Sequence, residues 1–447
     1  MRRLINMLVL VVLLGGLGAY IYFVDSKRPA SGGLPEKEKV FTVEADKLEE
    51  LTVTSDNETT TLRKVDGVWR IIAPVQAEAD QSAVSSLTSG LSSLEMNRVV
   101  EENATNLGEY GLAKPRIAVA YKAEGGGSGQ IQLGDKTATQ SDLYAVKDDG
   151  KRVFLVQAFQ ESTFNKKPFD LREKRILHFE RDKVDSVEIG RDGSSIQLSR
   201  SGSDWVLKEP VQARGDYSAI EGLLTRLSSA GMTKLVELQV DPATLTKYGL
   251  DTPAATLTLG AGSARATLAV GKEEEGAVYA RDLARQMIFA IEPGLVTDLK
   301  KAASDFRDKD LFEFRSFNVA RLRIVRGADS YEFQKVVTTG ENAGEKWQRM
   351  VGSTTSDVDT AKIDDFLGKL TALRAESFVT TPVDKPALVV SASYDGGKFE
   401  RVRFTRGTEA LATRDGEAGT ARIDTTSSDE TIKSFDALIA PPPPPAK

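Results

Sequence analysis

The sequence predicts an α+β protein of three tandem domains, each a largely antiparallel sheet with one packed helix, behind a single N-terminal membrane span. The first observation is that the chain's only tryptophans lie 136 and 142 residues apart, at Trp69, Trp205 and Trp347. The second is that an aspartate opens a helical pattern after each of them, at Asp80, Asp216 and Asp359. Two landmarks with one period indicate duplicated domains. The length of 447 residues supports the same count.

Residues 4–24 predict one membrane span. The segment is apolar apart from Asn6, and as a helix it reaches about 31 Å, which matches the hydrocarbon core of a bilayer. A cleaved secretory signal is the competing interpretation, but cleavage after Ala19 would put Leu17 where a small residue is required. We therefore expect an uncleaved anchor, with residues 1–3 inside the cell and the C-terminal part exported.

The rest of the chain divides into a stalk, three repeats and a tail. Residues 25–40 contain Pro29 and several small residues, which predicts a flexible stalk. We expect repeat domains at 41–177, 178–312 and 313–438. Residues 439–447 include five consecutive prolines, which indicates a disordered tail, with partner binding as the alternative.

Each repeat opens with short strand patterns, and the tryptophan lies on the third. The alternating apolar residues around Trp69 and Trp205 are typical of a half-buried sheet, and Pro74 and Pro210 end both strands at the same offset. We expect the tryptophans to be core residues rather than an aromatic ligand platform.

The helix after each aspartate carries an apolar stripe at spacings of three, four and seven. Each aspartate is placed to cap its helix through backbone N–H groups. Metal binding is the alternative, but no partner ligands recur near the aspartates. The stripes are Val84, Leu87, Leu91 and Leu94, then Ile220, Leu223, Leu224 and Leu227, then Ile363, Phe366, Leu367 and Leu370.

The most specific match between the first two repeats is Tyr-Gly-Leu-x-x-Pro. The glycine is expected to end a short helix in the left-handed conformation, and the proline to precede the next strand. A ligand-binding turn is the alternative. The motif comprises Tyr110, Gly111 and Pro115 in the first repeat and Tyr248, Gly249 and Pro253 in the second, and the third keeps only Lys385 and Pro386.

Charged residues also recur where one repeat meets the next. Residues 171–174 (Leu-Arg-Glu-Lys) match residues 306–309 (Phe-Arg-Asp-Lys). Exposed ion pairs contribute only about 0–1 kcal/mol, so a solvated joint is expected, with interdomain salt bridges as the alternative.

These markers, in tandem behind one membrane helix, resemble the bacterial family called domain of unknown function 4340. The resemblance runs from about Val40, closely in two repeats and weakly in the third. Members are often encoded beside ABC-transporter components similar to those of gliding motility. The resemblance implies an accessory role in the cell envelope, in association with ABC-transporter subunits. From the N-terminal span we expect a single-pass inner-membrane protein with its C-terminal ectodomain in the periplasm. The family supplies no catalytic residues.

Composition argues against an enzyme. The chain has no cysteine and one histidine, His178, which leaves little material for a thiol or serine nucleophile or a multi-histidine metal site. The net charge of −6 argues against nucleic-acid binding. We expect a non-catalytic scaffold or accessory subunit without metal or cofactor, its small-molecule ligand being unknown. A lipid- or glycan-binding module is the alternative, and a carboxylate hydrolase comes third.

Overall fold

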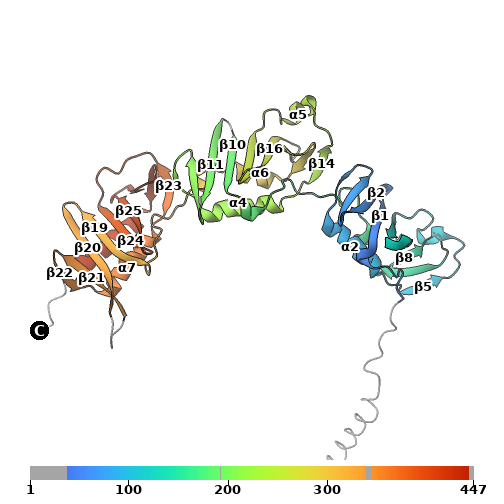
Figure 1. The fold of residues 1–447 in the computed structure, drawn as a ribbon, viewed down its shortest axis with the longest axis horizontal. Helices are drawn as coiled ribbons and strands as arrows, with labels where there is room; N and C mark the ends of the chain where they lie inside the picture. Colours follow the sequence, from blue (N-terminus) through green and yellow to red (C-terminus); the bar gives the residue numbers. More distant parts are fainter. Residues whose placement is uncertain (1–37, 149, 192, 339–343, 442–447) are drawn as a thin grey trace, which may run out of the picture. The chain divides into compact units, whose positions relative to one another are not determined.

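The computed structural model describes residues 38–148, 150–191, 193–338 and 344–441 (Figure 1). The chain forms two compact units, the first ending at Lys174 and the second beginning at Arg175. One nine-stranded sheet lies in the first unit and two lie in the second. Neighbouring strands pair antiparallel throughout these sheets, which confirms the predicted sheet type.

All three sheets have the same topology. The first has the order β4-β3-β2-β1-β6-β7-β8-β9-β5. Two four-stranded meanders therefore meet at the centre, and the strand that follows the main helix pairs with the last strand at the far edge. The strands of the first sheet are β1 Leu48–Ser55, β2 Glu58–Val65, β3 Val68–Ala73, β4 Ala77–Glu78, β5 Arg98–Glu101, β6 Ile117–Ala123, β7 Ser128–Lys136, β8 Asp142–Lys147 and β9 Val153–Gln157.

The second and third sheets repeat this order strand for strand, as the tryptophan period predicted. The strands of the second sheet are β10 Ser186–Arg191, β11 Ser194–Ser201, β12 Asp204–Glu209, β13 Ala213–Arg214, β14 Lys234–Glu237, β15 Ala255–Ala261, β16 Ala264–Glu274, β17 Ala277–Asp282 and β18 Ile288–Ile291. Those of the third are β19 Val319–Arg326, β20 Asp329–Thr338, β21 Gly344–Val351, β22 Thr354–Asp357, β23 Ala375–Val379, β24 Leu388–Tyr394, β25 Lys398–Phe404, β26 Ala410–Arg414 and β27 Thr420–Ile423.

One main helix accompanies each sheet: α2 (Gln81–Ser92), α4 (Tyr217–Ser229) and α7 (Thr360–Ala372). Figure 1 shows α4 lying across one face of the second sheet. The predicted apolar stripes are buried on all three helices, and Leu94, two residues beyond the end of α2, is buried with the first stripe. Burying these side chains contributes about 1.5–3 kcal/mol each, so the stripe holds the helix to its sheet.

Further helices complete each repeat, short in the first two and longer in the third, where α8 has 15 residues. The turn before β6 is a 3-10 helix, η3 (Leu107–Tyr110), and its counterpart before β15 is α5 (Pro242–Tyr248). A helix also follows the last strand of each repeat, as α3 (Gln160–Phe164), α6 (Pro293–Leu299) and α8 (Thr425–Ile439). Short 3-10 turns occur at η2 (Ala45–Lys47), η4 (Glu124–Gly126), η5 (Arg181–Lys183) and η6 (Ala303–Asp305).

The long helix α8 was not predicted. It packs beside α7, and Phe435 contacts Phe366 with ring centroids 5.5 Å apart. The buried positions of α8 include Ser428, Thr431 and Ser434 as well as apolar residues, so its stripe is weak in the sequence. These hydroxyls are satisfied by backbone carbonyls, which lets a polar stripe be buried.

The predicted span at residues 4–24 and most of the stalk lie outside the described residues. Within the described ranges, no helix is both long and apolar enough to cross a bilayer. The stalk prediction is wrong at its end: Val40 is buried in the first core and its N–H bonds to the carbonyl of Leu94 at 2.8 Å. At the other end of the chain, Ile439 is the last residue of α8 and Ala440 is its C-cap. Residues 442–447 of the predicted tail lie outside the described residues. The domain bounds at 177 and 312 stay predictions.

Candidate functional site at the junction of the second and third sheets

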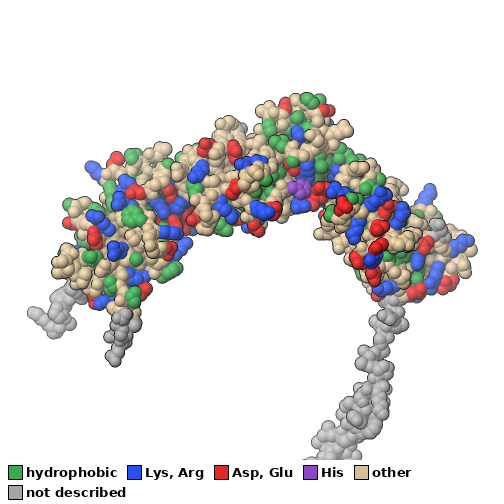
Figure 2. Space-filling model, in the orientation of Figure 1, with side chains coloured by type: hydrophobic (Ala, Val, Ile, Leu, Met, Phe, Trp, Pro, Cys, Tyr) green, Lys and Arg blue, Asp and Glu red, His purple; other side chains and the backbone are tan. Residues whose placement is uncertain are grey.

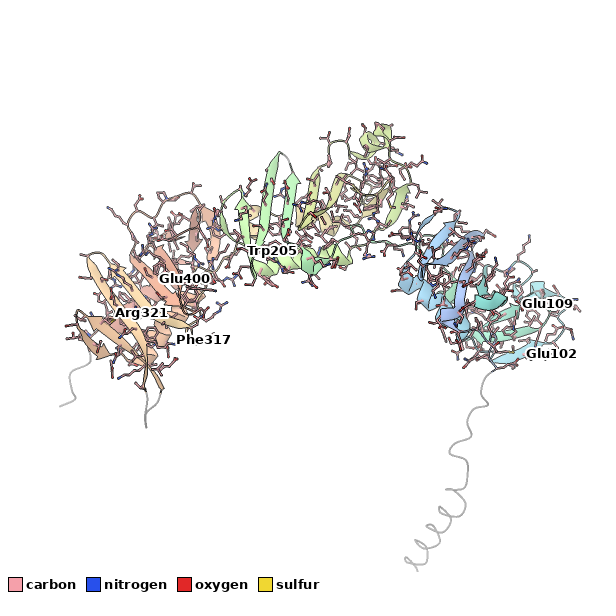
Figure 3. The ribbon with its side chains drawn as sticks, viewed as in Figure 1. Glu102, Glu109, Trp205, Phe317, Arg321 and Glu400 are labelled. Atoms are coloured by element: carbon pink, nitrogen blue, oxygen red, sulfur yellow. The ribbon has the colours of Figure 1, made fainter. Side chains whose placement is uncertain are left out.

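The three tryptophans are core residues. They lie on β3, β12 and β21 and are 8%, 1% and 3% exposed. Trp205, labelled in Figure 3, donates its indole N–H to Glu221 Oε1 at 3.0 Å. No ring face is therefore open enough on these three residues to form a ligand platform.

The three aspartates are N-caps. Asp80, Asp216 and Asp359 each accept backbone N–H groups from the first turn of their helix, the role predicted for them. No cluster of three or more potential metal ligands occurs among the described residues.

The Tyr-Gly-Leu motif is a packed turn. Gly111 and Gly249 both have φ of +67° and end their helices in the left-handed conformation. The tyrosine hydroxyls donate to acids on the edge strands, Tyr110 to Glu101 at 2.9 Å and Tyr248 to Glu237 at 2.8 Å. These contacts support the structural interpretation of the motif.

The joint between the second and third sheets is clamped by backbone hydrogen bonds on both sides. This joint lies wholly within the second compact unit. The segment 306–311 pairs back to the second repeat, where Asp308 N donates to Arg214 O at 2.9 Å. It pairs forward to the third repeat, where Ala375 N donates to Lys309 O at 2.7 Å. With both its edges bonded, the connection has little freedom to bend.

A buried ion-pair network crosses the same joint. Glu417, in the turn between β26 and β27, accepts from Arg214 Nε at 2.7 Å and from Arg307 Nη2 at 3.2 Å. The three side chains are 10%, 20% and 7% exposed, in that order. Arg307 also stacks on Phe378, its guanidinium carbon 3.8 Å from the ring centroid. The prediction of a solvated joint is therefore wrong here, and the alternative of interdomain salt bridges holds.

The network continues into the third sheet. Arg414 Nη2 lies 3.1 Å from Glu400 Oε2 and 3.4 Å from Glu313 Oε2, and its Nη1 lies 3.8 Å from Glu417. The Glu400 carboxylate, only 1% exposed, also accepts the backbone N–H groups of Glu313 and Phe314 at 3.1 Å. Buried ion pairs of this kind add little net stability, because desolvation offsets their attraction, but breaking one is costly. In this network it is Glu417 that joins the two repeats, through Arg214 of the second.

Charge state follows from the same contacts. Burial opposes the charge of Arg214, but Glu417 and Asp308 outweigh it and its pKa is raised. Burial raises the pKa of Asp308, and Arg214 opposes that rise only in part. Burial also raises the pKa of Tyr394 to about 12, with Glu400 and Glu313 contributing.

A cavity of about 600 Å³ opens beside the network. Trp205 and Tyr217 line it from the second repeat, and Glu313, Arg315 and Arg374 from the third. Tyr217 is 57% exposed, whereas Trp205 turns almost no surface to solvent. Acidic and basic side chains both line the cavity, together with apolar surface.

A family model matches residues 69–206 and 205–391, and its description is domain of unknown function (DUF4340). The two matches together cover well over half of the chain. The chain belongs to the DUF4340 family. No curated protein and no solved structure gave a significant match.

The DUF4340 matches are offset from the sheets. Each begins at a tryptophan strand and runs into the next repeat: the first match ends at Val206 on β12, and the second ends at Ser391 on β24. The second match contains Arg214 and Arg307, whereas Glu417 lies beyond it. Sequence reasoning found Arg307 as a repeated position but missed Glu417, Arg414 and Glu400. Nothing in the sequence marks those three, because the contacts that tie them to the joint are distant in the chain: Glu417 lies 203 residues from Arg214 and 110 from Arg307, and Arg414 lies 101 from Glu313.

Proposed function

We propose that this DUF4340 protein is a membrane-anchored, non-catalytic scaffold or accessory subunit of the bacterial envelope that works with an ABC-type transporter. The observation that carries the proposal is the clamped joint between the second and third sheets. Two sheets joined by backbone pairing and a buried ion network behave as one body, and such a body suits presentation of a surface to a partner. The sequence, with one histidine and no cysteine, supports a non-catalytic role. The transporter rests on family resemblance, an associational argument.

Affinity purification from native membranes in mild detergent, followed by mass spectrometry, tests the partner. We expect transporter ATPase and permease subunits to be enriched with the wild-type chain. Repeated failure to recover them, with a defined lipid or glycan enriched instead, would contradict the proposal.

Topology is tested by fusions after Lys447. We expect active alkaline phosphatase and a dark fluorescent protein, as a periplasmic C-terminus requires. The reverse pattern would place the repeats in the cytoplasm, and a mature N-terminus beyond Ala19 would replace the anchor by a cleaved signal.

A glycan-binding module is the second candidate, because the exposed ring of Tyr217 lines a cavity that also carries charged side chains. In that case Tyr217→Ala would abolish retention on cell-wall glycan. A hydrolase would need two free carboxylates in the cavity. Of the acids that line the cavity, Asp308, Asp310 and Glu313 are held in ion pairs and Asp216 caps α4, which leaves Asp204.

A further inference from the structure

The open face of the third sheet carries a row of arginines around a strand with small side chains. On β24, Ser391 and Ser393 alternate with the core residues Val390 and Ala392 and so lie on the opposite face of the strand. Ser393 is half-buried, whereas Ser391 is 7% exposed and its hydroxyl accepts a hydrogen bond from Arg401 Nε at 3.1 Å. Figure 3 labels Arg321, which lies on the neighbouring strand β19. The outward side chains beside the two serines are Arg321 and Arg323 on β19, and Phe399 and Arg401 on β25, with Arg403 following on β25.

The other two repeats show that the fold does not require these arginines. The registers are equivalent, since Leu51, Val187 and Leu322 occupy the same buried position on β1, β10 and β19. The five positions are compared in the order Arg321, Arg323, Phe399, Arg401 and Arg403. The first repeat carries at them Glu50, Thr52, Ser128, Gln130 and Gln132. The second repeat carries Ser186, Glu188, Arg265, Thr267 and Ala269. The same sheet forms with one arginine or none, so four of them in the third repeat need another explanation.

Their charges are available to a partner. Arg321 has no ion-pair partner among the described residues. Arg323 lies 3.6 Å from Glu332 with its side chain 59% exposed, and Arg401 lies 3.6 Å from Asp415 with its side chain 46% exposed. Arg403 shares Asp415. Exposed pairs of this kind contribute at most about 1 kcal/mol, so incoming carboxylates can replace them.

We propose that this face, formed by β19, β24 and β25, binds an extended acidic segment of a partner protein. Side chains on one face of an extended chain recur about every 6.7 Å, and so do the arginines along each strand. The two arginine rows are two strands apart, about 9.5 Å, and only the small side chains of β24 lie between them, so one extended chain can lie along the face between the rows. Carboxylates at every second residue of that chain then meet guanidinium groups in the bidentate geometry that arginine favours.

The exposed ring of Phe399, 58% accessible, offers an apolar contact at one end of the row. The inference deepens the proposed scaffold role and rests on it only for the identity of the partner.

The test is fluorescence anisotropy on the full-length chain in mild detergent, with a labelled peptide of alternating Glu and Ser. The variant R321S/R401T introduces the residues that the second repeat carries at those positions. The control R265S/R406S removes the same charge from the second sheet and from an exposed pair with Asp429. We expect affinity for the peptide to fall at least tenfold in the first variant and less than twofold in the control.

Three outcomes would overturn the inference: no binding of the peptide, equal loss in both variants, or sedimentation with phosphatidylglycerol vesicles through the same arginines without peptide binding. Equal affinity for a peptide of alternating Glu and for one of clustered Glu would contradict the proposed match between the spacing of the carboxylates and that of the arginines. If R321S/R401T recovers transporter subunits as well as the wild type, this face is not the transporter contact, and the scaffold role stands apart from it.

Discussion

Replacing Glu417 by glutamine keeps the shape of the side chain but removes the charge that Arg214, Arg307 and Arg414 share. Removing one partner of a fully buried ion pair costs about 3–5 kcal/mol. Since Arg214 is 20% exposed, we expect a loss at the lower end of this range, about 3 kcal/mol, in the free energy that keeps the joint between the second and third sheets closed. At about 1.4 kcal/mol per factor of ten, the open form of the joint becomes about 150-fold more populated.

Amide hydrogen exchange on the full-length chain in mild detergent measures this opening locally. Faster exchange is expected in peptides that cover 304–312 and 414–420, with the core of the first sheet unchanged. Glu409→Gln is the matched control, because Glu409 pairs with Arg422 in an exposed site where both side chains are nearly half accessible. Glu409→Gln should change the free energy of local opening, as measured by exchange, by no more than about 1 kcal/mol. If Glu417→Gln accelerates exchange no more than Glu409→Gln does, the network does not hold the joint.

Three further changes test the repeat itself. Gly271→Ala should destabilise the second sheet by about 1–3 kcal/mol in denaturant unfolding, because the new Cβ would lie 2.2 Å from the carbonyl oxygen of Tyr248. Gly222→Ala in α4 should stabilise the protein by up to about 1 kcal/mol, because the new Cβ would meet no neighbouring atom within 4 Å. Equal effects of the two changes would contradict this reasoning. Asp216→Ala should cost about 1 kcal/mol and speed exchange in the first turn of α4; an unchanged turn would show that the cap contributes nothing. Partial burial raises the pKa of Glu221, but Trp205, Arg181 and Arg200 outweigh burial and the pKa is lowered from 4.5. Its stabilisation is therefore present above pH 4.5 and is lost as pH falls through the lowered value. Glu221→Gln should therefore flatten the acid loss of stability in that range, and an identical pH profile would refute the assignment.

Much of the fold follows from local patterns. The helix-capping aspartates and the glycine of the Tyr-Gly-Leu turn act on neighbours within a few residues, and the tryptophans of the first two repeats lie in strands of alternating apolar residues, so the sequence predicts them directly. Helix α8 escaped prediction because Ser428, Thr431 and Ser434 face its core, and hydroxyls there read as a solvent face until their carbonyl partners are known.

The sequence by itself determined the repeats, their strand and helix types and the likeness of the first two copies, because periodicity and capping are short-range properties. Only the tertiary structure decided that Glu417 meets Arg214, a partner 203 residues away, and that the expected solvated joint is a buried one. Tertiary structure also decided that four arginines on strands β19 and β25 share one face. Charge alone does not predict burial or alignment, because the desolvation of an ion and its distance from a partner depend on which strands the fold brings side by side.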